Sequence, residues 1–206
     1  MTALLLAFAL SAKASFFSGD GLEPASGVKS NPAQSLALLS RFQNEQDLVV
    51  KLNGGELVVL PLWEDSRVNA TARRDKDEWI IEVYGGLLTH PAIGENELLL
   101  ILCHELGHHL GGAPTASRGG WASCEGQADY WSAKNCGHLL ANATETMLQL
   151  TRLYASQGTG GYPQLDTPDL SRASRTFFGY PSPQCRLDTL LAGMSGEERP
   201  MCWFAK

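Results

Sequence analysis

The segment Glu95–Leu110 constrains the fold of this chain more than any other. It carries apolar residues at helical spacing on most of its faces, and the glycines and proline of residues 111–114 follow it as stop signals. This pattern predicts one continuous, largely buried helix. Inside it stands His104-Glu105-Leu106-Gly107-His108, and side chains four residues apart share one face of a helix, so both imidazole rings can reach one metal ion.

Two histidine side chains do not hold a catalytic metal alone, because such sites use three protein ligands and keep a fourth position for water. In the pattern H-E-x-x-H-x-x-G-x-x-H the third ligand would fall on Pro114, which has no donor side chain, so that pattern fails. Glu125 begins a second predicted helix, with Asp129 one turn later on the same face. We predict that Glu125 is the third ligand and that Asp129 accepts the free ring N–H of a ligand histidine. The alternative is an ordinary polar helix face.

These residue types predict a hydrolytic site with one Zn²⁺ per chain. Zinc held by His104, His108 and Glu125 would bring the pKa of a bound water toward neutrality. Glu105 lies beside the first ligand and is the expected general base, which takes the proton of that water and passes it to the leaving group.

The residues around this site resemble the HtpX-like and CAAX-processing zinc metallopeptidases, which belong to the gluzincins. The resemblance covers roughly residues 56–190 and rests on residues 68–72, on residues 85–108 and on residues 125–129. The order of the predicted elements, strands and then helices, suggests an α+β fold with one small antiparallel or mixed sheet followed by a helical layer, as in the gluzincins. The resemblance implies cleavage of a protein or peptide substrate, as an endopeptidase rather than an exopeptidase. In such peptidases an edge strand pairs with the substrate, which assigns that task here to residues 79–83 and the following residues 84–86. The alternative is that residues 79–83 form an interior strand with its usual turn.

A looser part of the resemblance lies near the C-terminus. Family members often carry a histidine, a proline and then an arginine, and here Tyr180, Pro181 and Arg186 have that spacing, with tyrosine in the histidine position. Tyr180 and Arg186 are therefore the candidates for stabilising a developing oxyanion. Tyr180 could instead be a packing group, and Arg186 could be a structural partner of Asp188 or Asp129. The connection from His108 to Glu125 is also short for this family.

Composition limits the remaining possibilities. A chain of 206 residues with 44% hydrophobic residues predicts one globular domain, over residues 15–206. The net charge of −6 argues against nucleic acid or an anionic membrane as a partner. Residues 1–14 combine a short apolar run with an A-x-A pattern that predicts a signal peptide, and hence export to a bacterial periplasm or beyond. A plain N-terminal helix or a misassigned start codon stays open, and no segment approaches the length of a membrane span.

Five cysteines are compatible with an oxidising compartment. We predict a disulfide between Cys185 and Cys202, which bracket the C-terminal segment. Cys124 and Cys136 are excluded as a pair because one straight helix would hold them too far apart. Cys103 is interpreted as a small buried apolar residue.

The order of the remaining elements follows from local patterns. We predict a helix over residues 32–44, a hairpin of residues 47–52 with 56–60, and a second hairpin of residues 68–73 with 78–83. The helices of residues 95–110 and 125 onward are followed by a helix over residues 144–157. Thr167-Pro168 and Ser182-Pro183 then predict two further helix starts.

A second class of function stays open on the same scaffold. The chain could be a zinc-bearing binding or assembly protein of the cell envelope with weak or absent turnover. Loss of Glu105 would favour that interpretation, and Glu105 is present. The sequence therefore favours the peptidase over the binding protein, and both over a chance pentad in an unrelated α+β domain.

Overall fold

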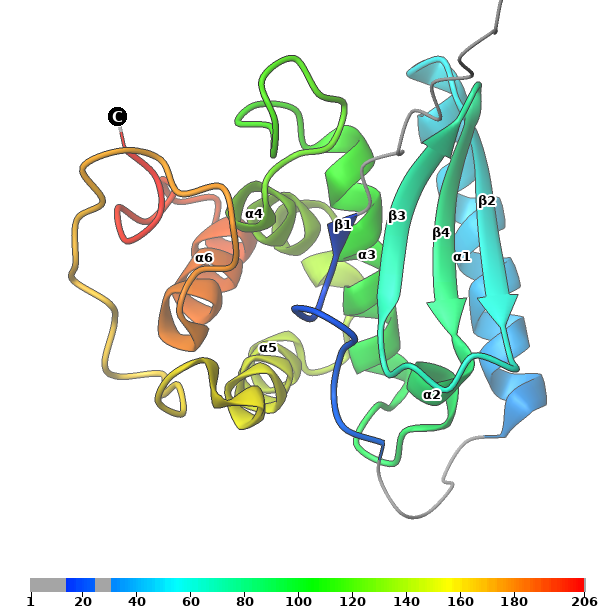
Figure 1. Cartoon of the computed structure of the whole chain (residues 1–206), viewed down its shortest axis with the longest axis horizontal. Coiled ribbons are helices and arrows are strands. Elements are labelled where there is room, and N and C mark those ends of the chain that lie inside the picture. The colour runs from blue at the N-terminus through cyan, green and yellow to red at the C-terminus, as the bar shows by residue number, and fades with distance from the viewer. Residues whose placement is uncertain (1–13, 25–30, 206) are drawn as a thin grey trace, which may run out of the picture.

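The computed structural model describes residues 14–24 and 31–205, which form an α+β fold with six α-helices and a four-stranded sheet (Figure 1). The elements in chain order are β1 Ala14–Ser15, α1 Pro32–Leu52, β2 Glu56–Leu62, β3 Ala70–Asp75, β4 Glu78–Tyr84, α2 Gly85–Thr89, α3 Glu95–Leu110, α4 Glu125–Cys136, the 3-10 turn η1 Gly137–Leu139, α5 Ala143–Tyr154, the π turn η2 Ala155–Thr159 and α6 Pro183–Ser195. The predicted fold class is confirmed at this level.

The sheet is mixed, with the strand order β1-β3-β4-β2. β3 and β4 pair antiparallel, which confirms the hairpin predicted for residues 68–73 and 78–83. β2 runs parallel to β4, and β1 runs antiparallel to β3. Strand β4 is therefore interior, because both of its edges already bond to neighbouring strands. The expectation that residues 79–83 form the free edge that meets a substrate is wrong.

The prediction that residues 47–52 form a hairpin with residues 56–60 is wrong. Residues 47–52 instead continue helix α1 to Leu52. Of the apolar residues in this stretch only Val50 is buried. A helix that packs one face against the sheet buries this residue, so a strand is not required. The outer edge of β2 is also already occupied by α1. Gln43 Oε1 accepts from the backbone N–H of Val59 at 2.8 Å, and Asp47 Oδ1 accepts from that of Leu57 at 3.4 Å. Because these two side chains already accept hydrogen bonds from the backbone N–H groups at the outer edge of β2, a further strand has no place to pair there.

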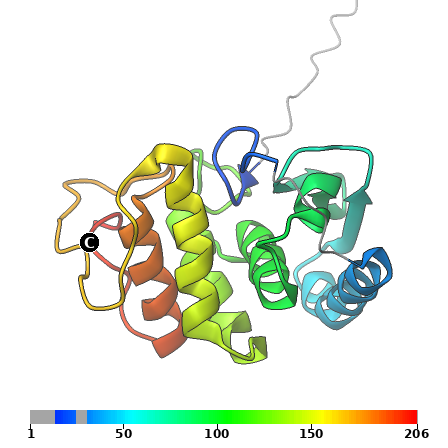
Figure 2. The ribbon, with the colours of Figure 1, turned by 90° about the horizontal axis from the view of Figure 1, so that it is seen from below.

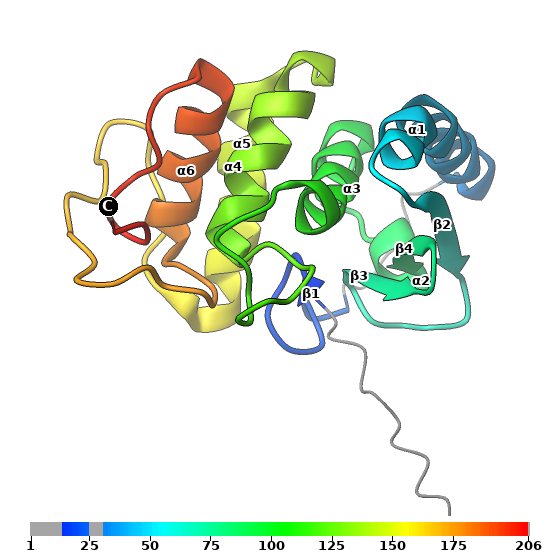
Figure 3. The same cartoon turned by 90° about the horizontal axis from the view of Figure 1, so that it is seen from above.

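Helix α3 lies at the centre of the molecule. Helices α1 and α3 lie on the same face of the sheet (Figure 3), and α4, α5 and α6 lie on the other side of α3 (Figures 2 and 3). Every residue from Leu98 to His109 is consequently buried. This position explains the apolar residues on most faces of α3, and it means that each polar side chain in its middle needs a specific partner.

The helices after α4 agree only in part with the predictions. Helix α5 covers most of the predicted residues 144–157, and the chain then continues through η2. The helix predicted at Thr167-Pro168 is absent, since residues 160–182 contain no helix. Leu165 and Leu170 in this stretch are exposed and so provide no buried face to stabilise a helix. The predicted start at Ser182-Pro183 is confirmed, because the Ser182 hydroxyl accepts from the backbone N–H of Cys185 at 3.2 Å.

Two disulfides join the described residues. The predicted bridge between Cys185 and Cys202 is present, and Cys124 is a free, buried thiol. The interpretation of Cys103 as a lone apolar residue is wrong, because Cys103 is bonded to Cys136. The two residues lie on α3 and α4, so only the packing of these helices brings them together. Their spacing along the chain carries no signal for such a pair.

Replacing Cys103 and Cys136 together by alanine is expected to lower the free energy of unfolding by about 3–4 kcal/mol, the value that loop-closure entropy gives for residues 33 apart. Urea unfolding of the double variant beside the wild-type chain measures the difference. Cys124→Ala is the matched control, because it removes a buried thiol without removing a cross-link. Peptide mapping without reductant that finds both cysteines as free thiols would contradict the assignment.

The predicted signal peptide lies outside the described residues, except for Ala14, which belongs to β1. Over residues 14–24 and 31–205, no helix has both the length and the apolar character needed to cross a bilayer.

Candidate metal centre

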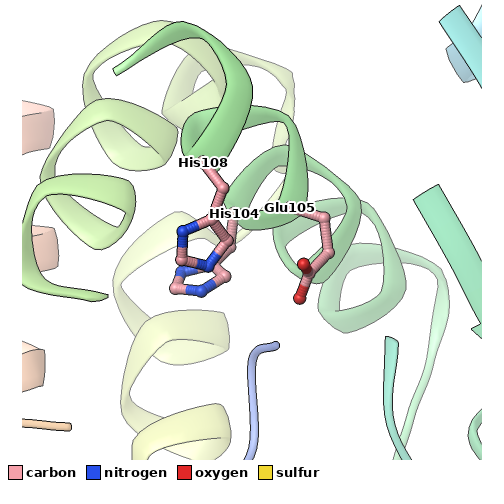
Figure 4. A group of neighbouring side chains, drawn as sticks. All are labelled: His104, Glu105 and His108. Carbon is pink, nitrogen blue, oxygen red and sulfur yellow. The ribbon is translucent and has the colours of Figure 1, made fainter. Parts of the chain in front are cut away.

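Helix α3 directs His104, Glu105 and His108 toward the same side (Figure 4). All three side chains are fully buried, and one possible ligand atom from each lies within 4.8 Å of the others. The predicted bounds of this helix are confirmed, so the two histidines lie one turn apart on the same face of α3, as expected. This cluster could bind a metal ion.

Glu125, the first residue of α4, brings a second carboxylate to the two imidazole rings. Its Oε2 lies 3.3 Å from His104 Nε2, and its Oε1 lies 3.7 Å from His108 Nε2. Ligand atoms about 2.0–2.1 Å from a tetrahedral metal lie roughly 3.3–3.5 Å from one another, so these three groups are spaced as ligands of one cation would be.

Gly107 allows α4 to come this close to α3. A Cβ atom at position 107 would lie 2.8 Å from the backbone oxygen of Ala128 and 3.2 Å from its Cα. Those separations are too short for a larger residue without moving α4. The glycine inside the pentad therefore sets the distance between the two helices that carry the candidate ligands.

The other ring nitrogen of each histidine has a partner. His104 Nδ1 lies 2.8 Å from Asp129 Oδ1, and His108 Nδ1 lies 2.8 Å from the backbone oxygen of Ser123. A carbonyl oxygen only accepts hydrogen bonds, so Nδ1 of His108 carries the hydrogen and its Nε2 is left with a free lone pair. The contact predicted between Asp129 and a ligand histidine is present.

Buried polar atoms without a hydrogen-bond partner show whether a cation would fit between these side chains. Among the described residues these include His104 Nε2, His108 Nε2, Glu125 Oε2 and both carboxylate oxygens of Glu105. Buried polar atoms are normally hydrogen-bonded, so a group of them converging on one point needs an explanation. A cation between the imidazole nitrogens and Glu125 would satisfy the first three atoms, and a water hydrogen-bonded to Glu105 would satisfy that carboxylate.

Burial and neighbouring charges shift the pKa values of the titratable side chains in this site in different directions. Burial lowers the pKa of His108 to about 3. Burial acts in the same direction on His104, but the adjacent carboxylates of Asp129 and Glu125 outweigh it and raise the pKa to about 9. Burial raises the pKa of Glu105 well above its ordinary value. Burial also raises the pKa of Glu125, and the neighbouring His104 partly offsets this rise.

Arg186 lies against Asp129 rather than against the imidazole nitrogens that face the site. Its Nε and Nη2 each donate to Asp129 at 2.8 Å, and both side chains are fully buried. This paired geometry holds the pKa of Asp129 well below its ordinary value, despite the opposing effect of burial. Of the two roles considered for Arg186, the geometry supports the structural partner of Asp129.

Tyr180 is directed toward the N-terminal segment. Its hydroxyl lies 2.8 Å from the backbone oxygen of Ser15 and 2.8 Å from the Ser15 hydroxyl. The ring packs against the core and stacks on Tyr154 at 6.2 Å between centroids. A role for this hydroxyl at an oxyanion would require Ser15 to move away first.

Two contacts of the site have no signal in the sequence. The backbone oxygen of Ser123 orients His108, and any residue could supply that atom, so no residue type marks it. The ring of Phe16 meets that of His104 edge to face, at 4.9 Å between centroids. Phe16 lies far from His104 along the chain, and only the fold brings the two together.

The comparisons with known proteins give no family. No family model, no curated protein and no solved structure matches this chain. Any function assigned to the chain therefore rests on the geometry and chemistry of the site.

Proposed function

We propose that this chain is a zinc-dependent metallopeptidase of the gluzincin type. The observation that carries the proposal is the convergence of His104 Nε2, His108 Nε2 and a Glu125 oxygen, buried beside a second carboxylate, that of Glu105. The Glu105 oxygens accept no hydrogen bond from any residue that the structure describes. Two imidazoles and one carboxylate suit zinc, and a separate carboxylate next to them suits a general base. The resemblance to HtpX-like and CAAX-processing peptidases agrees with this assignment.

The mechanism assigns a task to each side chain. When bound, zinc supplies a Lewis acid that polarises a peptide carbonyl and makes water more acidic. Glu105 takes a proton from the attacking water on its carboxylate and then gives that proton to the leaving nitrogen. Asp129 and the Ser123 carbonyl hold the Nδ1–H groups of the two histidines, which fixes the direction of each Nε2. Arg186 is a positioning residue, because it acts through Asp129.

The zinc-loaded chain is expected to cleave an unstructured protein such as casein. Removal of the metal by a chelator should stop cleavage, and added zinc should restore it. Because the site is fully buried, the assay should include a Phe16→Ala variant, in which the segment packed against His104 is loosened. Zinc-loaded protein with an accessible site and no cleavage of any peptide would contradict the proposal.

Glu125→Gln is expected to weaken zinc binding by more than the roughly 10–100-fold typical of an outer-shell partner, because an amide is a much poorer zinc ligand than a carboxylate. Competition with a chromogenic chelator measures the affinity. Glu145→Gln is the matched control, since Glu145 also lies in the first turn of a helix and is exposed. Equal zinc affinity of both variants would remove Glu125 from the ligand set.

The burial of the site is also compatible with the second candidate, a zinc-bearing assembly or binding protein of the cell envelope with weak or absent turnover. Export is supported by the two disulfides, which persist in oxidising compartments. The two candidates differ in one property: only the peptidase should lose a measurable cleavage rate when Glu105 is changed.

A further inference from the structure

Strand β1 covers the edge of the sheet nearest the candidate metal centre. It is the outermost strand, and Ala14 pairs with Ala72 while Ser15 pairs with Thr71. In Figure 3, β1 lies beside β3 on the side of the sheet that faces α3 and α4. An edge strand has unpaired backbone groups that readily accept an added extended chain. Here the chain's own N-terminal segment takes that place.

Phe16 follows β1 and contacts two residues of the proposed site. Its ring meets His104 edge to face, and its backbone oxygen accepts from Arg186 Nη1 at 2.8 Å. In Figure 4 the blue N-terminal segment passes directly below the three side chains. One buried residue therefore contacts both a candidate metal ligand and the positioning arginine.

The residues on either side of Phe16 are held mainly through their backbone. Asn69 accepts from the N–H of Phe17 at 3.1 Å and donates to its backbone oxygen at 2.9 Å. Tyr180 donates to the backbone oxygen of Ser15. Main-chain contacts of this kind, with a side-chain pocket at one position, are how proteins bind an extended peptide at a sheet edge.

We propose that residues 15–17, which remain in the chain after removal of the predicted signal peptide, occupy within the same molecule the groove that takes an extended peptide substrate, with Phe16 in the place of an apolar or aromatic substrate residue. The inference rests on the proposed function, because it names the substrate class and the regulation of the same site. The segment must leave the β3 edge before a substrate can pair there, so the closed chain has low activity. Displacing it also frees the Tyr180 hydroxyl, which is bonded to Ser15 in the closed form.

The test uses the full chain loaded with zinc and two variants that loosen the segment. Phe16→Ala removes the buried ring, and Tyr180→Phe removes only the hydroxyl that holds Ser15. The first readout is the rate at which a soluble chelator extracts zinc, which needs no turnover. We expect extraction to be about a hundredfold faster for Phe16→Ala and about fivefold faster for Tyr180→Phe. Phe178→Ala, at a phenylalanine that is 48% exposed, is the matched control and should leave the rate unchanged.

The second readout is cleavage of a fluorogenic peptide, which should rise in Phe16→Ala. A capped Ala-Ser-Phe-Phe peptide added in trans should slow both zinc extraction and cleavage in this variant. Thermal unfolding establishes that each variant is folded. If Phe16→Ala does not fold, Tyr180→Phe with the same peptide carries the test.

The outcomes separate this inference from the proposed function. Faster extraction that the peptide reverses, without cleavage in any variant, would support the occupied groove and count against the peptidase. Cleavage by the wild-type chain, with unchanged extraction in the folded variants, would support the peptidase and overturn the occupied groove. Faster extraction that the peptide does not reverse would also overturn it, because the segment would then cover the metal without filling a peptide groove.

Discussion

The Glu105→Gln variant is expected to keep its zinc and to cleave peptides about 10²–10⁴-fold more slowly than the wild-type chain. Glutamine has nearly the same shape as glutamate but cannot take a proton from water, so only the proton transfer is lost. Zinc content by elemental analysis and initial rates on the fluorogenic peptide measure the two properties separately.

This comparison is best made in the Phe16→Ala background, where the site is expected to be open. Glu95→Gln is the matched control, because Glu95 lies on the same helix and its side chain is 49% exposed. Equal cleavage by Glu105→Gln and the parent protein would remove Glu105 as the base. Loss of zinc from Glu105→Gln would instead make Glu105 a ligand, in agreement with its position within 4.8 Å of the histidine nitrogens.

Arg186→Met is expected to lower the free energy of unfolding by about 3–5 kcal/mol, the loss typical when one member of a buried ion pair is removed. Asp129 would be left with a charge in a fully buried position, and His104 would be the one side chain still bonded to its carboxylate within the described part of the chain. Methionine approximates the volume of arginine, so the change tests the charge rather than the packing. Urea unfolding measures the loss, and zinc affinity should fall as well, because Asp129 orients His104.

Arg41→Met is the control for this prediction. Arg41 pairs with Glu95 at 3.0 Å, but their side chains are 53% and 49% exposed, so the pair should contribute no more than about 1 kcal/mol. Comparable losses in the two variants would mean that Arg186 and Asp129 do not act as a buried pair.

The candidate site was largely predictable because its signals are local. The pentad and its helix are contiguous, and Glu125 and Asp129 lie one turn apart on the next predicted helix. Residue type also limited the choice, since few side chains can hold a metal. The same local reasoning failed for residues 47–52, where four apolar residues resemble a strand. There the packing of α1 along the edge of β2 decides the conformation.

Features that depend on distant parts of the chain were not predictable from the sequence. Strand β2 lies parallel to β4 and no tight turn joins the two, so this pairing could not be assigned from turn signals. Cys103 pairs with Cys136 only because α3 and α4 pack together. Phe16 contacts Arg186 and His104, and no spacing along the chain encodes these contacts.

The bridge between Cys103 and Cys136 has a consequence for when the protein matures. Cys103 is adjacent to His104, and Cys136 ends the helix that Glu125 begins, so the covalent link fastens together the two helices from which all the proposed ligands project. Before oxidation, packing alone keeps the ligands in register. A newly made chain in a reducing compartment should hence compete poorly for zinc, so oxidation should precede metal acquisition and the activity proposed for this site would arise only after the bridge has formed.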